Sequence, residues 1–525
     1  MNTATIQPDA PLTSARHRWR ATFWIVILLA LLARIPFYAT HHIQEDAYIT
    51  FRSAFHLADL GDYSFNLGDH ASGATSTLYG PFVAAVRFVF ASHAIAALSV
   101  LNTLIFLGGA ALLSCAFFTD WGERAIFFAA IAMLPEGMLI TYTGMEIPLQ
   151  AAVFCAAIFT LRRGQPTSAT LIGVLLLPLV RPDAIAFSFI LSLLAFSFDK
   201  LRGVLAFVFS LVGTGLVLVS NRLTTGNFLT STMRAKEITY HPQHGLHYFL
   251  LTAKTCLITR SYLLPVETKE LEWISPLVTI LVLAGCFAAL WLMRRQTVTF
   301  RLLLACLAAG TLIPAAYMAG GVIFPWYLWT GNWLCYVVAC FAIVKLTFAS
   351  NPRPRSLILA FLAVAWISLD GMQWLVSYNV GLQEFHYRAD VGRWLRQNAQ
   401  PRDTLELEPA GYIPFYAGLR TYDEIGLVSP LVLEYRTQYG PAWYMEFLKQ
   451  KHPDWLVERG YLYKHTTIDN VHLSPDDIRW FDTNYSLVRR FDYSPANYLN
   501  PGWLLKLMKN GTHDDYYVFR YTGAQ

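Results

Sequence analysis

Residues 44–52 read Gln44-Glu45-Asp46-Ala47-Tyr48-Ile49-Thr50-Phe51-Arg52, and they come shortly after the first long apolar run of the chain, Phe23 to Phe37. Two adjacent carboxylates this close to a hydrophobic segment are costly to place, because charged side chains are unfavourable in and beside a bilayer. The position of Glu45 and Asp46 therefore calls for a functional reason.

The composition of the chain is that of a membrane protein. It has 525 residues, of which 55% are hydrophobic and 14% are charged, against about 25% charged in a soluble domain. Apolar sequence in such long blocks has the bilayer as its natural solvent. The formal net charge of +5 is modest, and no basic tract suggests that the chain binds nucleic acid. The seven cysteines form no metal-ligand spacing and are interpreted as packing residues.

Apolar runs of helical length predict a polytopic α-helical protein. A helix needs roughly 17–25 apolar residues to cross a bilayer. Eleven such spans are expected, two of them short: 21–40, 93–118, 125–143, 147–161, 169–180, 184–198, 204–220, 274–293, 302–320, 326–346 and 356–376.

The distribution of basic residues predicts the orientation of these spans. No small-residue cleavage site follows the first run, so residues 1–20 are expected to stay in the cytoplasm as a tail before an uncleaved span. The short loops on that side are all basic, with Arg124, Arg162, Arg163, Lys200, Arg202, Arg294, Arg295, Arg301, Lys345, Arg353 and Arg355. The outer face then receives the long loop 41–92, the turns at 144–146, 181–183 and 324–327, the loop 221–273, and everything after 377. The polar motifs of the chain are thus predicted to gather on one outer surface.

The composition changes near residue 377, which divides a membrane domain (21–376) from a C-terminal extracytoplasmic domain (377–525). Phe385 to Gln397 is predicted to be a helix with Val391, Trp394 and Leu395 on one face. Three short strands are predicted at 404–407, 455–457 and 516–519. These elements indicate a small α/β domain with a core of its own.

The acidic pair allows three interpretations. A carboxylate at the outer surface can act as a general base toward a hydroxyl group, or as a ligand for a divalent cation such as Mg²⁺ or Mn²⁺. It can also cap the helix that follows, where Asp is a favoured residue. That helix is expected in the plane of the membrane interface, because apolar side chains recur at near-helical spacing at Tyr48, Phe51, Phe55 and Leu60.

A longer stretch carries a resemblance to a known family. The run EDAYITFRSAFHLADLGDYSFNLGDHASGATSTLYGP, from Glu45 onward, resembles the first outer loop of membrane glycosyltransferases of the GT-C fold, especially the AftB-type arabinofuranosyltransferases. In these proteins an acidic pair followed by AYI-FRYA, then N-G and a TS-LW segment, is characteristic. The present chain departs from the pattern with Glu45 in place of Asp and Tyr79 in place of Trp.

Four further segments resemble motifs of the same family in the same order. Residues 143–149 are similar to its GxE-T-L turn, with Ile147 in place of Thr, and 179–183 are similar to its RPD motif. Residues 226–236 resemble its G-x-x-PNT-x-x-AK segment with a degraded centre, and 325–327 resemble its late aromatic turn. The resemblance spans most of the chain.

The resemblance implies an enzyme of the bacterial inner membrane with its active site on the periplasmic face. Its expected reaction transfers a pentofuranosyl residue, arabinofuranosyl first of all, from a polyprenyl-phosphate donor to an envelope glycan, glycolipid or protein. The alternatives are transfer of another lipid-linked sugar, such as a hexose or aminoarabinose, and transport of a lipid-linked glycan.

The resemblance also implies roles for particular residues. Asp46 is the expected catalytic carboxylate, with Glu45 beside it. The donor phosphate is expected to bind cations that the positive-inside rule does not predict on the outer face, namely Lys236, Arg181 and Arg234. For Arg181 an ion pair with Asp183 is the alternative. No metal ligands are assigned, and a divalent cation is the possible cofactor. The expected substrate cavity includes Glu146, Asp183, Arg52, Thr75, Ser76 and Tyr327.

Overall fold

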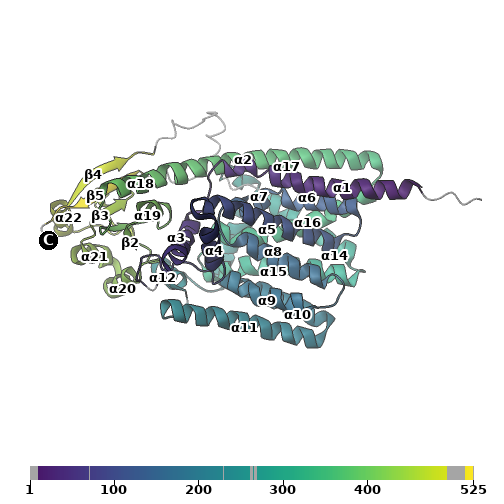
Figure 1. Cartoon of the computed structure of the whole chain (residues 1–525), viewed down its shortest axis with the longest axis horizontal. Helices are drawn as coiled ribbons and strands as arrows, with labels where there is room; N and C mark the ends of the chain where they lie inside the picture. The colour runs from purple at the N-terminus through teal and green to yellow at the C-terminus, as the bar shows by residue number, and fades with distance from the viewer. Residues whose placement is uncertain are drawn as a thin grey trace, which may run out of the picture.

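Apolar helices run side by side in one bundle, and a mixed domain covers one end of it (Figure 1). The structure is a computed structural model, and it describes residues 10–69, 71–228, 230–259, 264, 269–493 and 515–523. Residues 1–9 of the expected cytoplasmic tail and residues 494–514 and 524–525 of the expected C-terminal domain lie outside the described residues.

The bundle is built from helices of very different lengths. Its members are α1 (Ala10–Leu32), α2 (Ile35–Tyr38), α4 (Tyr79–Phe90), α5 (Ala94–Phe117), α6 (Trp121–Ala132), α7 (Pro135–Tyr142), α8 (Ile147–Leu161), α9 (Ser168–Val180), α10 (Ile185–Phe198), α11 (Lys200–Thr225), α14 (Ser275–Met293), α15 (Thr297–Gly320), α16 (Pro325–Ala349) and α17 (Pro352–Gly381).

The predicted number of spans agrees roughly with these helices. Among the described residues, seven helices are long and apolar enough to cross a membrane, and the pair α6–α7, bent by 63°, makes an eighth. The helices α8, α9 and α10 are shorter apolar helices at positions where the sequence predicts spans. The protein is therefore a multi-pass membrane protein, and its short spans flank the turn at Arg181 as expected.

The expected outer loop 41–92 contains two helices, α3 (Glu45–Leu60) and the start of the α4–α5 span. Helix α3 begins at Glu45, and its N-cap is Gln44. Neither carboxylate of the acidic pair is thus the N-cap that the sequence allowed; both stand in the first turn. Anionic side chains are favourable there, because the helix N-terminus carries a partial positive charge.

The membrane domain is joined to the C-terminal domain by continuous helix. α17 passes into a π-helical turn, η5 (Leu382–Arg388), and then into α18 (Ala389–Asn398). The helix predicted at 385–397 is therefore present, but its first residues, up to Arg388, belong to the π-helical turn. Val391 and Leu395 are buried and Trp394 packs against them, as the pattern predicted.

The C-terminal domain is a mixed α/β layer structure. Its sheet has the order β2-β1-β3-β5-β4, with β1 parallel to β2 and β3, and β5 antiparallel to β3 and β4. The strands are β1 (Thr404–Leu407), β2 (Arg420–Asp423), β3 (Trp455–Glu458), β4 (Tyr485–Phe491) and β5 (Tyr516–Tyr521), and the helices after α18 are α19 (Tyr412–Ala417), α20 (Pro430–Tyr439), α21 (Trp443–Lys451) and α22 (Pro475–Asn484). The three predicted strands are β1, β3 and β5, whereas β2 and β4 were not predicted.

Three glutamates are buried together at the carboxyl ends of the parallel strands. Glu406, Glu424 and Glu458 are at most 1% exposed. Tyr444 donates a hydrogen bond of 3.1 Å to Glu406, and the hydroxyl of Tyr461 donates to Glu424. Burial raises the pKa of Glu406 to about 8 and that of Glu458 to about 8, and it raises the pKa of Glu424 well above its ordinary value. These carboxyl groups are held in their protonated form.

The glutamate cluster predicts that the C-terminal domain loses stability as pH rises. The folded-state pKa values lie above the ordinary value of 4.5, so the folded domain binds more protons than the unfolded chain between pH 4.5 and about 8. We expect the free energy of unfolding to fall by a few kcal/mol, on the order of 2, across that window. Thermal unfolding of the purified protein from acidic to alkaline pH measures the effect. Glu406→Gln should flatten the decline, and the exposed control Glu434→Gln should leave it unchanged.

Candidate functional site

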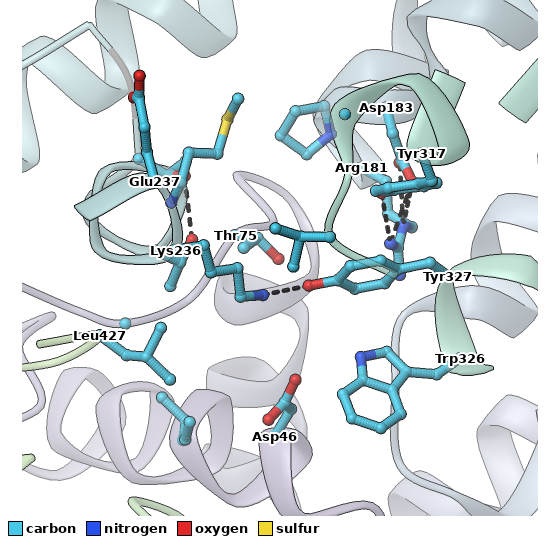
Figure 2. A pocket seen from close by; sticks show the side chains of 18 of the residues that line it. Asp46, Thr75, Arg181, Asp183, Lys236, Glu237, Tyr317, Trp326, Tyr327 and Leu427 are labelled. Carbon is cyan, nitrogen blue, oxygen red and sulfur yellow. Dashed lines mark hydrogen bonds and ion pairs between the residues drawn. The ribbon is translucent and has the colours of Figure 1, made fainter. Parts of the chain in front are cut away.

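A cavity of about 510 Å³ lies where the membrane domain meets the C-terminal domain. Segments far apart in the sequence contribute to its wall, and Figure 2 shows their side chains facing a common space. The residues of its wall include Asp46, Ile49, Thr50, Thr75, Glu146, Arg181, Asp183, Lys236, Glu237, Tyr317, Trp326, Tyr327 and Leu427.

Asp46 enters the cavity from the first turn of α3, followed by Ile49 and Thr50 on the same helix face. Its carboxylate points toward the side of the cavity where Lys236 and Tyr327 meet (Figure 2). Burial raises the pKa of Asp46, and the ammonium of Lys236 opposes that shift. A partly buried carboxylate of raised pKa binds a proton more readily than an exposed one, and it is therefore suited to act as a general base.

A tight turn brings Glu146 next to α3. Gly144 has φ of 79°, in the left-handed region that favours glycine. A Cβ atom there would lie 2.9 Å from Phe51, 3.0 Å from Ile43 and 3.2 Å from Ala47. The glycine therefore allows the turn to pack directly on the beginning of α3.

Arg181 is the centre of a buried charge network. It precedes Pro182, which favours an extended backbone, and its φ and ψ are −147° and 133°. Its guanidinium lies 2.7 Å from the carboxylate of Glu146 and 3.0 Å from that of Asp183. Tyr317 donates a hydrogen bond of 2.5 Å to Asp183. The predicted alternative, an ion pair between Arg181 and Asp183, is thus present, and Glu146 joins it.

Lys236 comes from α12 (Ser231–Tyr240), whose N-cap Thr230 accepts a hydrogen bond of 3.2 Å from the amide of Met233. The ammonium of Lys236 donates to the hydroxyl of Tyr327 and lies 5.2 Å from the ring centre of Phe324. Burial lowers the pKa of Lys236, and the nearby Asp46 raises it. The Lys236 nitrogen lies in the cavity, with the carboxylate of Asp46 on the opposite side of the open space (Figure 2).

Aromatic rings form one side of the cavity. Tyr317 stacks on Tyr327 with ring centres 4.5 Å apart, and Trp326 stacks on Phe324 at 4.9 Å. Within the described part of the chain, the indole N–H of Trp326 has no hydrogen-bond partner. Aromatic faces with a free donor are suited to hold a sugar ring, which offers apolar C–H faces and hydroxyl acceptors.

Four residues expected at the site lie elsewhere. Glu45 contacts the C-terminal domain, and Arg52 donates to the backbone carbonyls of Phe65, Pro414 and Leu419 at 2.9, 2.7 and 2.6 Å. Ser76 accepts a hydrogen bond of 2.8 Å from the amide of Tyr79 at the start of α4. Arg234 is exposed on α12 and is not part of the described cavity wall. The other expected residues, Asp46, Lys236, Arg181, Glu146, Asp183, Thr75 and Tyr327, do line the cavity.

Tyr317, Glu237 and Leu427 are among the wall residues that sequence reasoning missed. Tyr317 lies inside an apolar span, where its hydroxyl group is the one feature of the sequence that could have marked it as a site residue. Glu237 follows Lys236 directly but is not part of the resemblance. Leu427 belongs to the C-terminal domain, and nothing in its local sequence distinguishes it from a core residue.

A divalent cation finds no ready ligand set in the described residues, since no three His, Cys, Asp or Glu side chains come together closely enough to hold one. Glu146 and Asp183 are both engaged by Arg181. We therefore derive no chemical step through a metal ion.

Comparison with solved structures defines the fold. ArnT from Cupriavidus metallidurans bound to undecaprenyl phosphate superposes with a TM-score of 0.55 at 13% identity, covering 95% of this chain and 98% of that one. Archaeal oligosaccharyltransferase AglB from Archaeoglobus fulgidus, in complex with an inhibitory peptide and a dolichol-phosphate, gives 0.50 at 10% identity, covering 92% and 74%. The apo form of that oligosaccharyltransferase gives 0.51 at 12% identity, covering 96% and 74%.

The chain thus has the GT-C fold, as the sequence predicted. A family model described as a domain of unknown function (DUF8728) matches residues 377–519. No curated protein matches the chain in sequence. The narrower resemblance to AftB-type enzymes stays a prediction.

The charge network around Arg181 predicts a stability cost when it is broken. Glu146→Gln removes one of two carboxylates from a guanidinium that is 6% exposed. We expect the free energy of unfolding to fall by about 1–3 kcal/mol, measured as a lower melting temperature in detergent. The double variant Glu146→Gln/Asp183→Asn should lose more than the sum of the two single changes, and additive losses would contradict the network.

Proposed function

We propose that the chain is an integral-membrane glycosyltransferase that uses a polyprenyl-phosphate sugar donor. The observation that carries the proposal is that Asp46 and Lys236 face each other in a cavity at the end of the membrane bundle. A lipid-phosphate donor needs a cation for its phosphate and a base for the acceptor hydroxyl at that depth. The GT-C fold, shared with ArnT and AglB, supports the assignment.

Lys236 is the cation best placed to bind the donor phosphate. Arg181 already holds two carboxylates at 2.7 and 3.0 Å, so its charge is balanced inside the protein. Lys236 has a neutral phenol as its hydrogen-bond partner, and the carboxylates of Asp46 and, less strongly, Glu146 act on its charge from nearby. A phosphate diester that enters the cavity therefore pairs with Lys236, and Arg181 stays paired with its two carboxylates.

Asp46 is proposed as the general base. It takes the proton of the acceptor hydroxyl as the acceptor oxygen forms a bond to the anomeric carbon of the donor sugar. The bond from that carbon to the phosphate oxygen breaks, and its electron pair leaves with the polyprenyl phosphate. The leaving phosphate is a weak base, so no acid is needed to protonate it. A single displacement of this kind inverts the configuration at the anomeric carbon.

The motifs shared with AftB-type enzymes support a pentofuranosyl residue, arabinofuranosyl first, as the transferred sugar. The proposed acceptor is an envelope glycan, glycolipid or protein, and the proposed location is the outer face of a bacterial inner membrane. A hexose or aminoarabinose donor is the alternative, and transbilayer transport of a lipid-linked glycan is the less favoured one. Mg²⁺ or Mn²⁺ dependence is tested by adding EDTA and then restoring each ion.

Reconstituted transfer tests the role of Asp46. Wild-type protein in liposomes is given polyprenyl-phosphate-arabinofuranose, or the aminoarabinose and hexose analogues, with glycan acceptors. We expect Asp46→Asn to lower kcat by roughly 10²- to 10⁴-fold, since an amide cannot accept the proton. Because the pKa of Asp46 is raised, protonation should begin to inactivate the wild-type protein at a pH higher than 3.8, the ordinary carboxyl pKa.

Equal transfer by Asp46→Asn and wild type would remove Asp46 from the mechanism. Movement of the lipid-linked sugar across the bilayer without transfer would favour the transporter. Thr77→Val changes another residue of the expected outer loop 41–92, at a position outside the described cavity wall, and it serves as the control.

Lys236→Met is expected to weaken donor binding. The methionine keeps the length of the side chain but removes its charge, so KM for the donor should rise by roughly 10- to 100-fold. Direct binding of undecaprenyl phosphate, measured by thermal stabilisation, should fall in parallel. Arg234→Met, on the exposed side of the same helix, should bind the donor like wild type, and an equal loss in both variants would contradict a specific role for Lys236.

A further inference from the structure

The two carboxylates at the start of α3 face different parts of the molecule. Asp46 lines the cavity, whereas the carboxylate of Glu45 lies against the C-terminal domain. One oxygen of Glu45 accepts hydrogen bonds from the amides of Gly411 at 2.6 Å and Tyr412 at 3.0 Å. The other lies 3.2 Å from the guanidinium of Arg388. We refer to these contacts as the Glu45 junction.

The junction is closely packed. A Cβ atom on Gly411 would lie 2.3 Å from the backbone oxygen of Glu45 and 2.5 Å from its carboxylate. The chain at residue 411 thus needs glycine in order to reach the first turn of α3. The side chains of Glu45 and Arg388 are 12% and 11% exposed, so water screens their attraction weakly.

Arg388 links the junction to the membrane domain. It is the last residue of the π-helical turn η5, which continues α17 into α18. Glu384, one turn earlier, lies 2.7 Å from Arg388 and holds its guanidinium in place. The hydroxyl of Tyr516 accepts a further hydrogen bond of 3.0 Å from Arg388. π-Helical turns often occur at functional positions, and this one aims a cation at the helix that carries Asp46.

The rest of α3 is fixed on the same side. The rings of Tyr48 and Tyr412 lie 4.0 Å apart, and the hydroxyl of Tyr412 donates to the carbonyl of Ile43 at 2.9 Å. The guanidinium of Arg52 reaches the backbone of the C-terminal domain at Pro414 and Leu419. One face of α3 is therefore bound to the C-terminal domain along its first two turns, and the opposite face forms the cavity wall.

We propose that Glu45 is a positioning residue, through which the C-terminal domain holds α3 in the orientation that directs Asp46 into the cavity. This inference rests on the proposed glycosyl transfer. It replaces a chemical role for Glu45 with a geometric one: its carboxyl group accepts from two amides and one guanidinium, and it lies against the carboxyl group of Glu384. A displacement of about 1 Å at a catalytic group is enough to lower a rate by about 100-fold.

The experiment compares Glu45→Gln with Glu45→Ala in the full-length protein. The glutamine can still accept from the amides of Gly411 and Tyr412, whereas alanine cannot. We expect Glu45→Ala to lower kcat by roughly 10- to 100-fold with donor KM within about twofold of wild type. Glu45→Gln should recover most of that loss. Amide hydrogen exchange should be faster over residues 45–52 in Glu45→Ala and in Arg388→Ala.

A matched control breaks a different contact between the same two parts of the chain. Arg420 pairs with Asp69 at 2.5 Å, away from the first turn of α3. Arg420→Ala should keep the kcat and the exchange rates of residues 45–52.

Three outcomes would overturn the proposal. Glu45→Gln as inactive as Glu45→Ala would mean that the carboxylate acts chemically. Unchanged kcat in both variants, or unchanged exchange over residues 45–52, would mean that the junction does not position α3. If wild type transfers no sugar, the proposed function fails, and hydrogen exchange in Arg388→Ala still decides whether the junction holds the helix. Arg388→Ala also serves if Glu45→Ala does not fold.

Discussion

An α-helix turns about 100° per residue, so two neighbouring side chains on it cannot face the same way. At the first turn of α3 this constraint sends Asp46 into the cavity and Glu45 into the C-terminal domain. The cost of bringing two carboxylates out of water is offset in part by the helix N-terminus, where negative charge is favourable by roughly 0.3–1 kcal/mol. The membrane bundle and the sheet domain are therefore joined at the same helical turn that carries Asp46, the proposed base.

The charges of the cavity are arranged so that one cation stays available. Arg181 is balanced by Glu146 and Asp183 within 3.0 Å, so it forms a fixed part of the wall. Lys236 pairs with a phenol, and it faces Asp46 (Figure 2). A lysine ammonium is a compact charge on a flexible stem, so Lys236 is the cation of the wall that can adjust to an anionic ligand, as the proposed function requires.

The sequence was sufficient for the bundle and for the convergence of the polar motifs, because span length and loop charge are read over many residues. It located β1 without error, since Thr404–Leu407 alternates polar and apolar residues and is bounded by turn signals. It missed β2, whose Arg420-Thr421-Tyr422-Asp423 is polar and lies at the edge of the sheet. Tyr317 could not be found within an apolar span.

Arg52 and Glu45 were assigned to the site for a reason that sequence alone could not correct. Both belong to the motif that carries the family resemblance, but their partners in the C-terminal domain lie 343 to 367 residues away along the chain. Whether a motif residue faces substrate or a neighbouring domain depends on where its helix begins. A start at Glu45 with Gln44 as the cap fixes that rotation, and local pattern left the choice between cap and first turn open.

The C-terminal domain contacts the membrane domain through the sheet edge that is formed by the carboxyl ends of its parallel strands. In α/β sheets, ligands bind beyond the carboxyl ends of parallel strands. Here the segment after β1 supplies the amides of Gly411 and Tyr412 to Glu45. The segment after β2 accepts a hydrogen bond of 3.1 Å from Thr239 of α12 at the carbonyl of Ile425, and it places Leu427 in the cavity wall.

The two helices that carry Asp46 and Lys236 thus both dock on this edge. The domain therefore contributes to the cavity chiefly by holding in place the two helices that carry Asp46 and Lys236, which come from separate parts of the chain.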